Sequence, residues 1–479
     1  MVPREEFQDL YDQGPDAVYD YLLSELARRD ERVQELEAQR GKDSHNSSKP
    51  PSSDGLKRGS PKPHSLRESG QRPNGGQPGH PGRTLSQVEQ PNEVIWYRPQ
   101  VCEVCGCELS DAPMAEEPER RQVFDVPRPG LVVTEYRVCS CACPVCQSPN
   151  RGSFPTDISQ PAQWGRRMLG LGIYLMAHHL VPVGRTQEAL RDLYGQAPSQ
   201  ATLLQAVADS YVNLAEVEQA TKQALGSAGV VHFDETGVRV EGRLDWIHVA
   251  STADLTYLAH HRRRGRVALN DIALLPNFTG VSVHDAYGSY REFGDGRHAL
   301  CNAHVLRELV GCWERDRQGW AHRLMALLRL VLHAKKLALA ADQTAFEPDL
   351  LARIVVCYRR IVARGLAQNP RPAPSGRSGQ PKRGPARSLL ERLERYEVEH
   401  LRFAFDFQVP FDNNQAERDF RMVKVQQKTS GCFRTSAGAD QFCRIRGYLS
   451  TLRKQGINLL DALCATVAGS PIWPSLVPT

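Results

Sequence analysis

At residue 229 the sequence changes from a helical pattern of apolar residues to an alternating one, and this change constrains the fold more than any other feature. Three segments with a period of two follow one another with short turns between them: VVHFDETGVRV, LDWIHVAST and LTYLAHHRRR. Such alternation predicts three consecutive strands. A helix is then predicted over 268–275, and FTGVSVHDAY predicts a fourth strand.

Two aspartates follow apolar runs in these strands. Asp234 comes after VVHF in the first strand, and Asp285 comes after VSVH in the fourth. A buried carboxylate costs several kcal/mol to desolvate unless it is paired or binds a cation. Three antiparallel strands, a helix and a further strand are the order of the ribonuclease-H-like (RNase-H-like) α/β fold, in which the first and fourth strands are neighbours. For either residue alone, an aspartate in a turn is the simpler interpretation, and nearby acids compete for the role: Glu235 and Asp295.

A third carboxylate, Glu417, lies among cations in the segment PFDNNQAERDFRMVKVQQKTSGCFR, residues 410–434. Arg421 and Lys424 follow it at i+4 and i+7, so a helix would place all three on one face. Candidates for the N-cap precede that helix: Asp412, Asn413 and Asn414. Two interpretations are open, a solvated charged face or a metal-binding acid with phosphate-binding neighbours. Other acids compete with Glu417: Asp412 and Asp419.

If these strands and this helix converge, the carboxylates of Asp234, Asp285 and Glu417 would meet at one point. Three carboxylates repel one another unless divalent cations lie between them. Oxygen ligands suit Mg²⁺ or Mn²⁺, and two ions about 3.5–4 Å apart can activate a nucleophile and stabilise a leaving oxygen. The sequence therefore predicts a two-ion site on these three residues.

Seven cysteines lie within residues 91–150. They include two CxxC pairs separated by a strand-like stretch, RRQVFDVPRPGLVVTEYRV: Cys102 with Cys105, and Cys143 with Cys146. This is the form of a zinc ribbon, in which two such turns hold one tetrahedral Zn²⁺. Further cysteines leave the ligand register open, since some of them could replace Cys143: Cys107, Cys139 and Cys141. Reduced structural thiols are the alternative.

Composition and charge indicate a folded chain that meets a polyanion. Apolar residues make up 41% of the sequence, and the net charge of +5 is mild. Basic residues gather without acids between 354 and 390, which suits nucleic acid or a basic loop with no partner. The N-terminus MVPREEFQDL carries acids where a signal peptide needs cations, and the longest apolar run, 168–177, is too short to cross a bilayer. We expect a cytoplasmic, nucleoid-associated protein with reduced cysteines and no membrane partner.

Four blocks of the sequence resemble the insertion-sequence-sixty-six family of bacterial transposases: HFDET, VHDAYGSYREF, CNAHVLREL and DNNQAERDFRMVKVQQKTSGCFRTSAGADQF. The resemblance extends over nearly the whole chain, including the GGQPGHPGRTL linker and the cysteine-rich region. It implies a DDE catalytic triad, carried here by Asp234, Asp285 and Glu417, and a zinc-binding domain. In CNAH, Cys301 and His304 resemble the Cys/Asp-x-x-His element found after the second aspartate of such enzymes.

The resemblance implies a DNA transposase that nicks the ends of an insertion sequence and joins the freed 3′-hydroxyl to target DNA. It implies DNA as partner, a homo-oligomer of at least two chains on DNA, and helper proteins from the same element. Basic residues near Glu417 would hold backbone phosphates rather than read bases, or would form a solvated face: Arg418, Arg421, Lys424 and Lys428. A repurposed or inactive DNA-binding protein and a nuclease without strand transfer are the rival functions.

The expected organisation has seven parts. Residues 16–40 predict a short coiled coil or a simple amphipathic helix, and the helical pattern over 160–225, with Ser199 as a candidate N-cap, predicts a DNA-binding helix-turn-helix or a structural bundle. The parts are an N-terminal helix (1–40), a disordered basic linker (41–90), a zinc-binding module (91–152), a helical DNA-binding domain (153–226), the first part of an RNase-H-like catalytic core (227–300), a helical insertion with a basic loop (301–400), and the second part of the core with C-terminal helices (401–479).

Overall fold

The computed structural model describes residues 85–111, 113, 119–127, 129–293, 297–371 and 384–477. The described residues divide into two compact units, a smaller one before Tyr136 and a larger one from Tyr136 onward. The expected N-terminal helix and most of the expected linker lie outside the described residues, and the expected zinc module falls partly in each unit.

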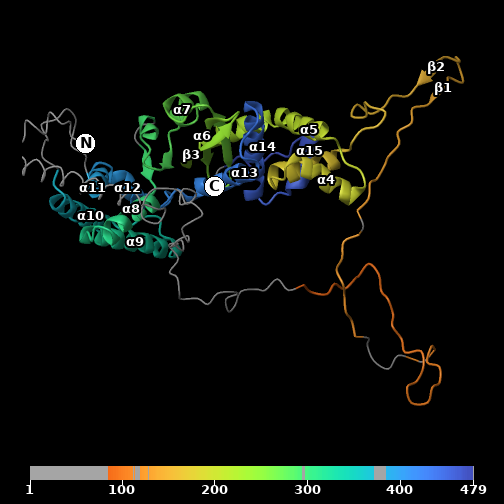
Figure 1. Ribbon diagram of the computed structural model, residues 1–479, viewed down its shortest axis with the longest axis horizontal. Helices are drawn as coiled ribbons and strands as arrows, with labels where there is room; N and C mark the ends of the chain where they lie inside the picture. Colours follow the sequence, from red (N-terminus) through yellow and green to blue (C-terminus); the bar gives the residue numbers. More distant parts are fainter. Residues whose placement is uncertain are drawn as a thin grey trace, which may run out of the picture. The chain divides into compact units, whose positions relative to one another are not determined.

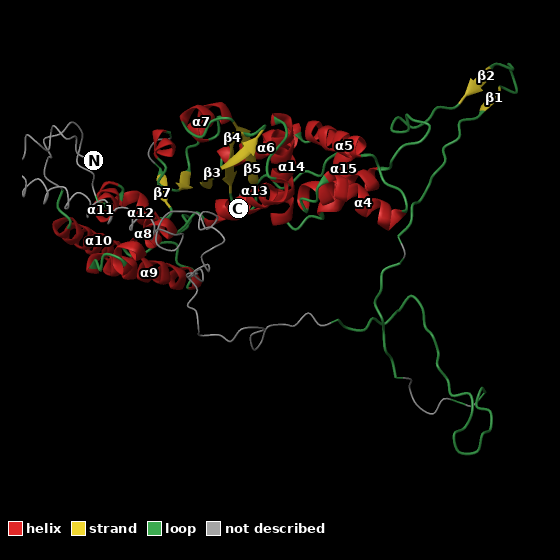
Figure 2. Ribbon diagram, viewed as in Figure 1, coloured by secondary structure: helices red, strands yellow, loops and turns green. Residues whose placement is uncertain are grey.

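A five-stranded mixed sheet forms the centre of the larger unit (Figure 2), and its strand order is β5-β4-β3-β6-β7. The strands are β3 (Val230–Val240), β4 (Arg243–Ser251), β5 (Thr256–His261), β6 (Val281–His284) and β7 (His298–Leu300). β3, β4 and β5 pair antiparallel, whereas β6 pairs parallel with β3 and β7 parallel with β6. The α/β prediction and the pairing of the first and fourth strands are confirmed. The sequence did not predict β7, because three residues are too few to show a period.

Alternation along β3 separates the two faces of the sheet. Val238 and Val240 face a helix that follows much later in the sequence and pack against its buried residues: Ala416, Phe420 and Val423. Val231 and Phe233 belong to a different apolar cluster, with residues from the helices on the opposite face: Leu225, Leu269 and Leu274. Neighbouring residues of β3 therefore enter different surroundings, as a period of two requires.

Two C-terminal helices cover one face of the sheet, α13 (Asn414–Ser430) and α14 (Ser436–Lys454). The last helix, α15 (Leu459–Val467), packs against α14 and the helices that precede the sheet. In Figure 1, α13 and α14 (blue) lie beside the strands of the sheet (green), α13 against β3 and β4 and α14 against β5, although they are far from these strands in the sequence. The sheet face with Val238 thus becomes a buried surface on which α13 is held.

The helices before the sheet share an apolar cluster with the C-terminal helices. They are α3 (Arg166–Ile173), η2 (Tyr174–His178), α5 (Gln200–Asn213) and α6 (Ala215–Gly226). Between η2 and α5, α4 (Val183–Tyr194) packs on α3 and α5, and α7 (Arg266–Ile272) lies between β5 and β6. Ser199 caps α5 as expected, accepting a hydrogen bond from the N–H of Thr202 at 3.1 Å. After Ser199 the predicted helical pattern forms two helices, α5 and α6, which meet at Leu214, and the Leu214 side chain is fully buried in the shared cluster.

The segment between the sheet and α13 is helical, as the sequence predicts. It contains α8 (Asn302–Glu314), α9 (Gly319–Ala340), α10 (Pro348–Gln368), α11 (Pro385–Arg395) and α12 (Glu397–Phe405). These helices have an apolar core of their own around Trp320 and Tyr358, which are 1% and 0% exposed. The insertion is therefore held by its own packing and does not interrupt the sheet.

The stretch between the two CxxC pairs is not a strand in the part that is described, contrary to the expectation. Its residues have no strand assignment, and Val123, Val132 and Val133 are 88–94% exposed. Apolar side chains that are this exposed supply no face for a sheet to bury. A short hairpin, β1 (Ser140–Ala142) with β2 (Pro149–Arg151), carries the second pair instead. No helix among the described residues is long and apolar enough to cross a membrane.

His260 predicts a pH-dependent stability. Its Nδ1 lies 2.9 Å from Asp440 on α14 and its Nε2 lies 2.9 Å from Asp245 on β4. Burial opposes the imidazolium charge, but the two carboxylates outweigh burial and raise the pKa of His260. Because the folded state holds this proton more tightly than the unfolded chain, the stabilisation is present below about pH 6.5 and is lost as pH rises through the raised pKa.

We therefore expect the melting temperature of the unchanged chain to fall between about pH 6 and pH 8, and His260→Gln to show a smaller fall. Differential scanning calorimetry at several pH values measures it. His333→Gln, on the exposed side of α9, is the matched control and should keep the pH profile of the unchanged chain. Equal profiles for His260→Gln and the unchanged chain would contradict the assignment.

Candidate active site

The pairing of β3 with β6 brings Asp234 and Asp285 together. The two strands run parallel with His232 opposite Val283, so Asp234 and Asp285, two residues further along each strand, occupy matching positions. Asp234 lies in the middle of β3, whereas Asp285 directly follows β6. Each carboxylate accepts a 2.8 Å hydrogen bond from a nearby backbone N–H, and both keep further acceptor capacity.

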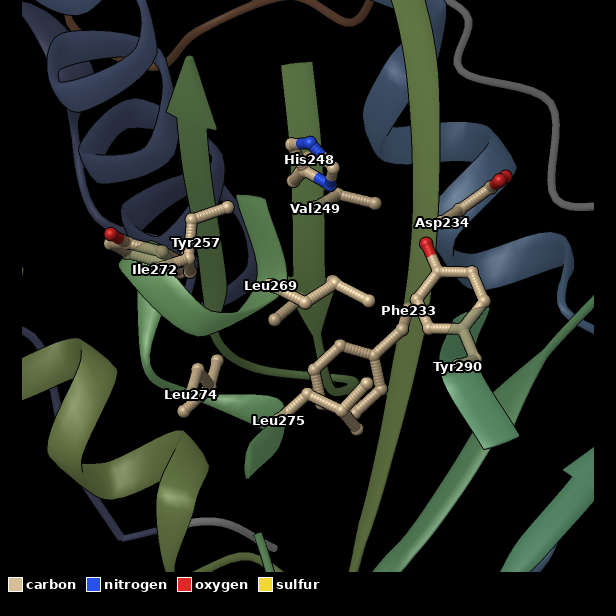
Figure 3. A pocket seen from close by; sticks show the side chains of 11 residues that line it. Phe233, Asp234, His248, Val249, Tyr257, Leu269, Ile272, Leu274, Leu275 and Tyr290 are labelled. Carbon is tan, nitrogen blue, oxygen red and sulfur yellow. The ribbon is translucent and has the colours of Figure 1, made fainter. Parts of the chain in front are cut away.

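Asp234 lies on the face of the sheet that α13 covers. Figure 3 shows the Asp234 side chain pointing away from a small apolar cavity, which is lined on the opposite face by residues that include Phe233, Leu269 and Leu275. Burial raises the pKa of Asp234 well above its ordinary value, and the charges of the neighbouring acids raise it further: Glu235, Asp285 and Glu417. A buried carboxylate surrounded by other carboxylates requires either a proton or a cation.

Glu417 lies in the first turn of α13 and is the third acid to act on Asp234. Its side chain is 42% exposed and lies 3.8 Å from Arg307 of α8. Burial raises the pKa of Glu417, and the guanidinium of Arg307 opposes that shift. Arg307 was not singled out from the sequence, because nothing local marks it as a neighbour of a helix more than a hundred residues away.

The two competing acids of this segment have other partners. Asp419 forms an ion pair with Lys454 of α14 at 3.0 Å and accepts a hydrogen bond from Ser450 at 3.2 Å. Asp412 accepts a 3.0 Å hydrogen bond from the N–H of Asn414. Among these acids, Glu417 therefore has the carboxylate whose charge reaches Asp234 and which is not already held by a lysine.

The chemistry of the donor set fits a divalent cation, although the structure does not bring the three carboxylates fully together: among the described residues, the group of three potential ligands whose atoms lie within 4.8 Å of one another is the cysteine cluster. Asp234, Asp285 and Glu417 offer carboxylate oxygens, which are the ligands that Mg²⁺ and Mn²⁺ prefer. Burial, and after it the charges of the neighbouring acids, raise the pKa of Asp234, and no described cation forms an ion pair with it. A metal ion bound there would supply the missing positive charge.

One of the three N-cap candidates takes the N-cap position, but its side chain has another role. Asn413 is the N-cap of α13 by position, but its side chain makes no capping hydrogen bond. Its Oδ1 lies 2.8 Å from His232 Nδ1, and its Nδ2 donates to the carbonyl of Phe233 at 2.9 Å. Asn413 is 1% exposed, so this N-cap residue is also part of the buried site.

The four predicted phosphate-binding cations are not equivalent in the structure. Three are exposed on α13: Arg418, Arg421 and Lys428. Lys424 is half-buried, and burial lowers its pKa while the charge of Asp234 opposes that shift. Of the four, Lys424 is therefore the cation that interacts with Asp234, and because α13 is helical over this stretch, Glu417, Arg421 and Lys424 lie on one side of it as expected.

Sequence reasoning missed a second network directly behind Asp234. Glu235 is on the opposite face of β3, where its side chain is 2% exposed. Arg264 binds the Glu235 carboxylate at 2.6 Å, and the hydroxyl of Tyr290 donates to the same carboxylate. The Arg264 guanidinium also stacks on Tyr287, 3.9 Å from the ring centre. Because Tyr287 comes two residues after Asp285, this network ties the loop of the second aspartate to the strand of the first.

Cys301 and His304 lie where β7 meets α8. The Cys301 sulfur accepts a hydrogen bond from the N–H of Asn413 at 3.2 Å. Burial lowers the pKa of His304 to about 4, so the ring is neutral at neutral pH, and its Nδ1 has no partner among the described residues. Cys301 thus helps to fix the segment that leads into α13.

Each CxxC pair forms the same backbone turn in its own unit. In the first turn the N–H of Cys102 donates to the carbonyl of Cys107 at 2.8 Å, and in the second the N–H of Cys143 donates to Ser148 at 2.9 Å. The sulfurs of one cluster lie within 4.8 Å of one another: Cys102, Cys105 and Cys107. In the second turn, hydrogen bonds from Ser148 lower the pKa of Cys146 to about 7. Two turns with this geometry suit thiolate metal ligands.

Comparison with known families agrees with this geometry. The Transposase IS66 family matches residues 161–441, which include the sheet, the helical insertion and α13. The chain is therefore a DNA-processing enzyme of the transposase class, and DNA is its partner. It belongs to the IS66 family of transposases, since the match covers more than half of the sequence. Residues 3–86 match a second family, described as a family of unknown function (DUF6444). No curated protein matches the chain.

The Glu235–Arg264 pair predicts a stability effect. Arg264→Met leaves a nearly fully buried carboxylate without its cation. Breaking a fully buried pair costs about 3–5 kcal/mol, and because the Arg264 side chain is 39% exposed we expect about 1–3 kcal/mol less free energy of unfolding. Urea titration of the metal-free protein measures this change. The double variant Arg264→Met/Glu235→Gln should recover most of it, and a single variant as stable as the unchanged chain would contradict the role of the pair.

Proposed function

We propose that the protein cleaves DNA at the ends of an insertion sequence and transfers the cut strand to target DNA by a DDE mechanism. Its catalytic residues are Asp234, Asp285 and Glu417. The strand order β5-β4-β3-β6-β7, with β6 and β7 parallel to β3, supports an RNase-H-like core for this reaction.

The parallel pairing of β3 with β6 is the observation that carries the proposal. It gives two aspartates about fifty residues apart in the sequence matching positions. The buried surface on which α13 lies brings Glu417 close enough for its charge to act on Asp234. Structural ion pairs also perturb pKa values, but among the described residues no cation forms an ion pair with Asp234, and Lys424 acts on it only through its charge.

Bound Mg²⁺ or Mn²⁺ would lower the pKa of the attacking hydroxyl and neutralise charge at the phosphorus. The chain's own residues hold and orient the DNA. The exposed cations of α13 would bind backbone phosphates: Arg418, Arg421 and Lys428. Lys424, which is half-buried, would bind the phosphate nearest to Asp234. Because transposition joins two ends, we also propose at least two chains on the DNA, with helper proteins of the same element.

Glu417→Gln tests the triad most selectively, since it keeps the size of the side chain and removes its charge. Loss of a metal ligand removes several kcal/mol of transition-state stabilisation, so cleavage should fall by about a thousandfold or more. DNA binding should stay within about threefold, because phosphate contacts come from other residues. The assay uses purified full-length chain, labelled element-end DNA and Mg²⁺, with binding followed by fluorescence anisotropy.

Asp412→Asn is the matched control, because it removes a carboxylate from the same segment and keeps the oxygen that accepts from Asn414. It should retain at least about a third of the cleavage rate. Cleavage without end joining would favour a nuclease over a transposase. Binding without cleavage, unchanged in Asp234→Ala, would contradict both enzymatic functions and favour a DNA-binding protein.

We also propose that the CxxC turns hold structural zinc and that this metal folds a DNA-contacting module. Its thiolate ligands are Cys102, Cys105, Cys143 and Cys146. The observation that supports this register is that Cys107 takes the position in the first turn that Ser148 takes in the second. The Cys107 sulfur lies 3.1 Å from the Cys105 sulfur, and the Ser148 hydroxyl lies 2.8 Å from the Cys146 sulfur. This position therefore suits a side chain that hydrogen-bonds to a metal ligand as well as one that binds the metal itself.

Metal analysis after dialysis tests the zinc proposal, and we expect about one zinc per chain. Cys102→Ser or Cys143→Ser should lower the zinc content by at least about half, because the thiolate is the ligand. Cys107→Ser should leave the content unchanged, since Ser148 already fills that position in the other turn. A zinc content well below one in the unchanged chain would remove the proposal, and zinc loss in Cys107→Ser would instead make Cys107 a ligand.

A further inference from the structure

Asn413 contacts both the strand that carries Asp234 and the helix that carries Glu417. Its side-chain Nδ2 donates to the carbonyl of Phe233, the residue directly before Asp234, at 2.9 Å. Its backbone carbonyl accepts from the N–H of Glu417 at 3.3 Å. Two hydrogen bonds through one side chain and its backbone therefore join the peptide next to Asp234 to the peptide of Glu417.

The orientation of the Asn413 amide follows from its partners. The carbonyl of Phe233 can only accept, so the amide NH₂ must face it and Oδ1 must face His232. His232 Nδ1 then carries a proton and donates to Oδ1 over 2.8 Å. A reversed amide would place two acceptors together on one side of a buried side chain. The network therefore has one satisfied arrangement.

The backbone N–H of Asn413 adds a third attachment, to Cys301 before α8. The preceding turn is held as well, because the N–H of Asn302 donates to the carbonyl of Phe411 at 3.1 Å. The chain entering α13 is thus fixed against β3 on one side and against the start of α8 on the other. Arg307, which lies beside Glu417, belongs to that same α8.

We propose that Asn413 is a positioning residue of the DNA-cleavage site, which sets the separation between the Asp234 and Glu417 carboxylates. The proposal rests on the proposed function, in which these carboxylates bind the same metal ions. Glu417 is partly exposed and its nearest cation is 3.8 Å away, so its own contacts hold it weakly. A site for metal ions or catalysis needs its groups within about 0.5 Å of the productive geometry.

The fold of this region does not depend on Asn413 alone. The buried residues of α13 already pack on the sheet in a cluster of their own: Ala416, Phe420 and Val423. This apolar packing keeps α13 on the sheet, whereas directional hydrogen bonds from Asn413 set where the first turn stands along β3. Removing the Asn413 amide should therefore lower the affinity for the metal ion, whereas the apolar packing of α13 should keep the melting temperature close to that of the unchanged chain.

The test is a titration of the full-length chain with Mn²⁺, followed by electron paramagnetic resonance, with thermal melting of the same samples. Asn413→Ala should weaken Mn²⁺ binding by about 10–100-fold, as loss of a partner behind a metal ligand does. Asn414→Ala is the matched control, since Asn414 is the next residue and is exposed. It should bind Mn²⁺ within about twofold of the unchanged chain.

A second pair of variants tests the network from the strand side and covers the case in which Asn413→Ala does not fold. His232→Leu removes the donor to Asn413 Oδ1 and should weaken Mn²⁺ binding, whereas His232→Gln keeps a donor and should restore much of it. If His232 only fills space, His232→Gln is not expected to restore Mn²⁺ binding relative to His232→Leu.

Two outcomes separate the failure of this proposal from the failure of the proposed function. If Glu417→Gln loses Mn²⁺ but folded Asn413→Ala and His232→Leu bind it as the unchanged chain does, Asn413 is not a positioning residue and the metal site stands. If Glu417→Gln itself binds Mn²⁺ unchanged, the metal site is wrong and the positioning proposal fails with it.

Discussion

The burial of Asp234 beside other carboxylates is the constraint on which the rest of this structure depends. The parallel pairing of β3 and β6 brings Asp234 and Asp285 to matching positions, and the sheet around them excludes much of the water that would screen their charges. The direct effect is a raised pKa for Asp234, which a bound cation would reverse. The arrangement is unfavourable for a purely structural core, and this gives it a functional meaning.

The surrounding elements meet this constraint in different ways. On the face of Asp234, α13 packs through apolar residues and delivers Glu417 and Lys424. On the opposite face, Arg264 neutralises Glu235. Of the two adjacent acids of β3, Glu235 therefore has an ion-pair partner, whereas Asp234 has none among the described residues. The helical insertion contributes Arg307 beside Glu417 and has its own core. Residues from separate elements of the chain thus surround Asp234 and Glu235 on the two faces of β3.

The sequence predicted what depends on local periodicity. Alternation in β3, β4 and β5 predicted the strands, and the apolar runs before Asp234 and Asp285 predicted where those acids would stand. It did not predict β7, which is too short to show a period, or the junction of α5 and α6 at Leu214, whose side chain is buried in a tertiary apolar cluster. Asn413 was assigned to a helix cap by its type and position, but a buried histidine from a distant strand competes for the same side chain. Contacts such as Arg307 with Glu417 join residues far apart in the sequence, and no local pattern encodes them.

The central claim is that Asp234, Asp285 and Glu417 form a single metal site. Anomalous X-ray diffraction from crystals of the full-length chain grown with Mn²⁺ tests it most directly. The account predicts anomalous peaks within about 2.5 Å of oxygens from all three carboxylates, as expected for Mn²⁺ with oxygen ligands. Ordered carboxylates with no anomalous peak between them, or a peak held by other acids such as Asp412 or Asp419, would contradict it.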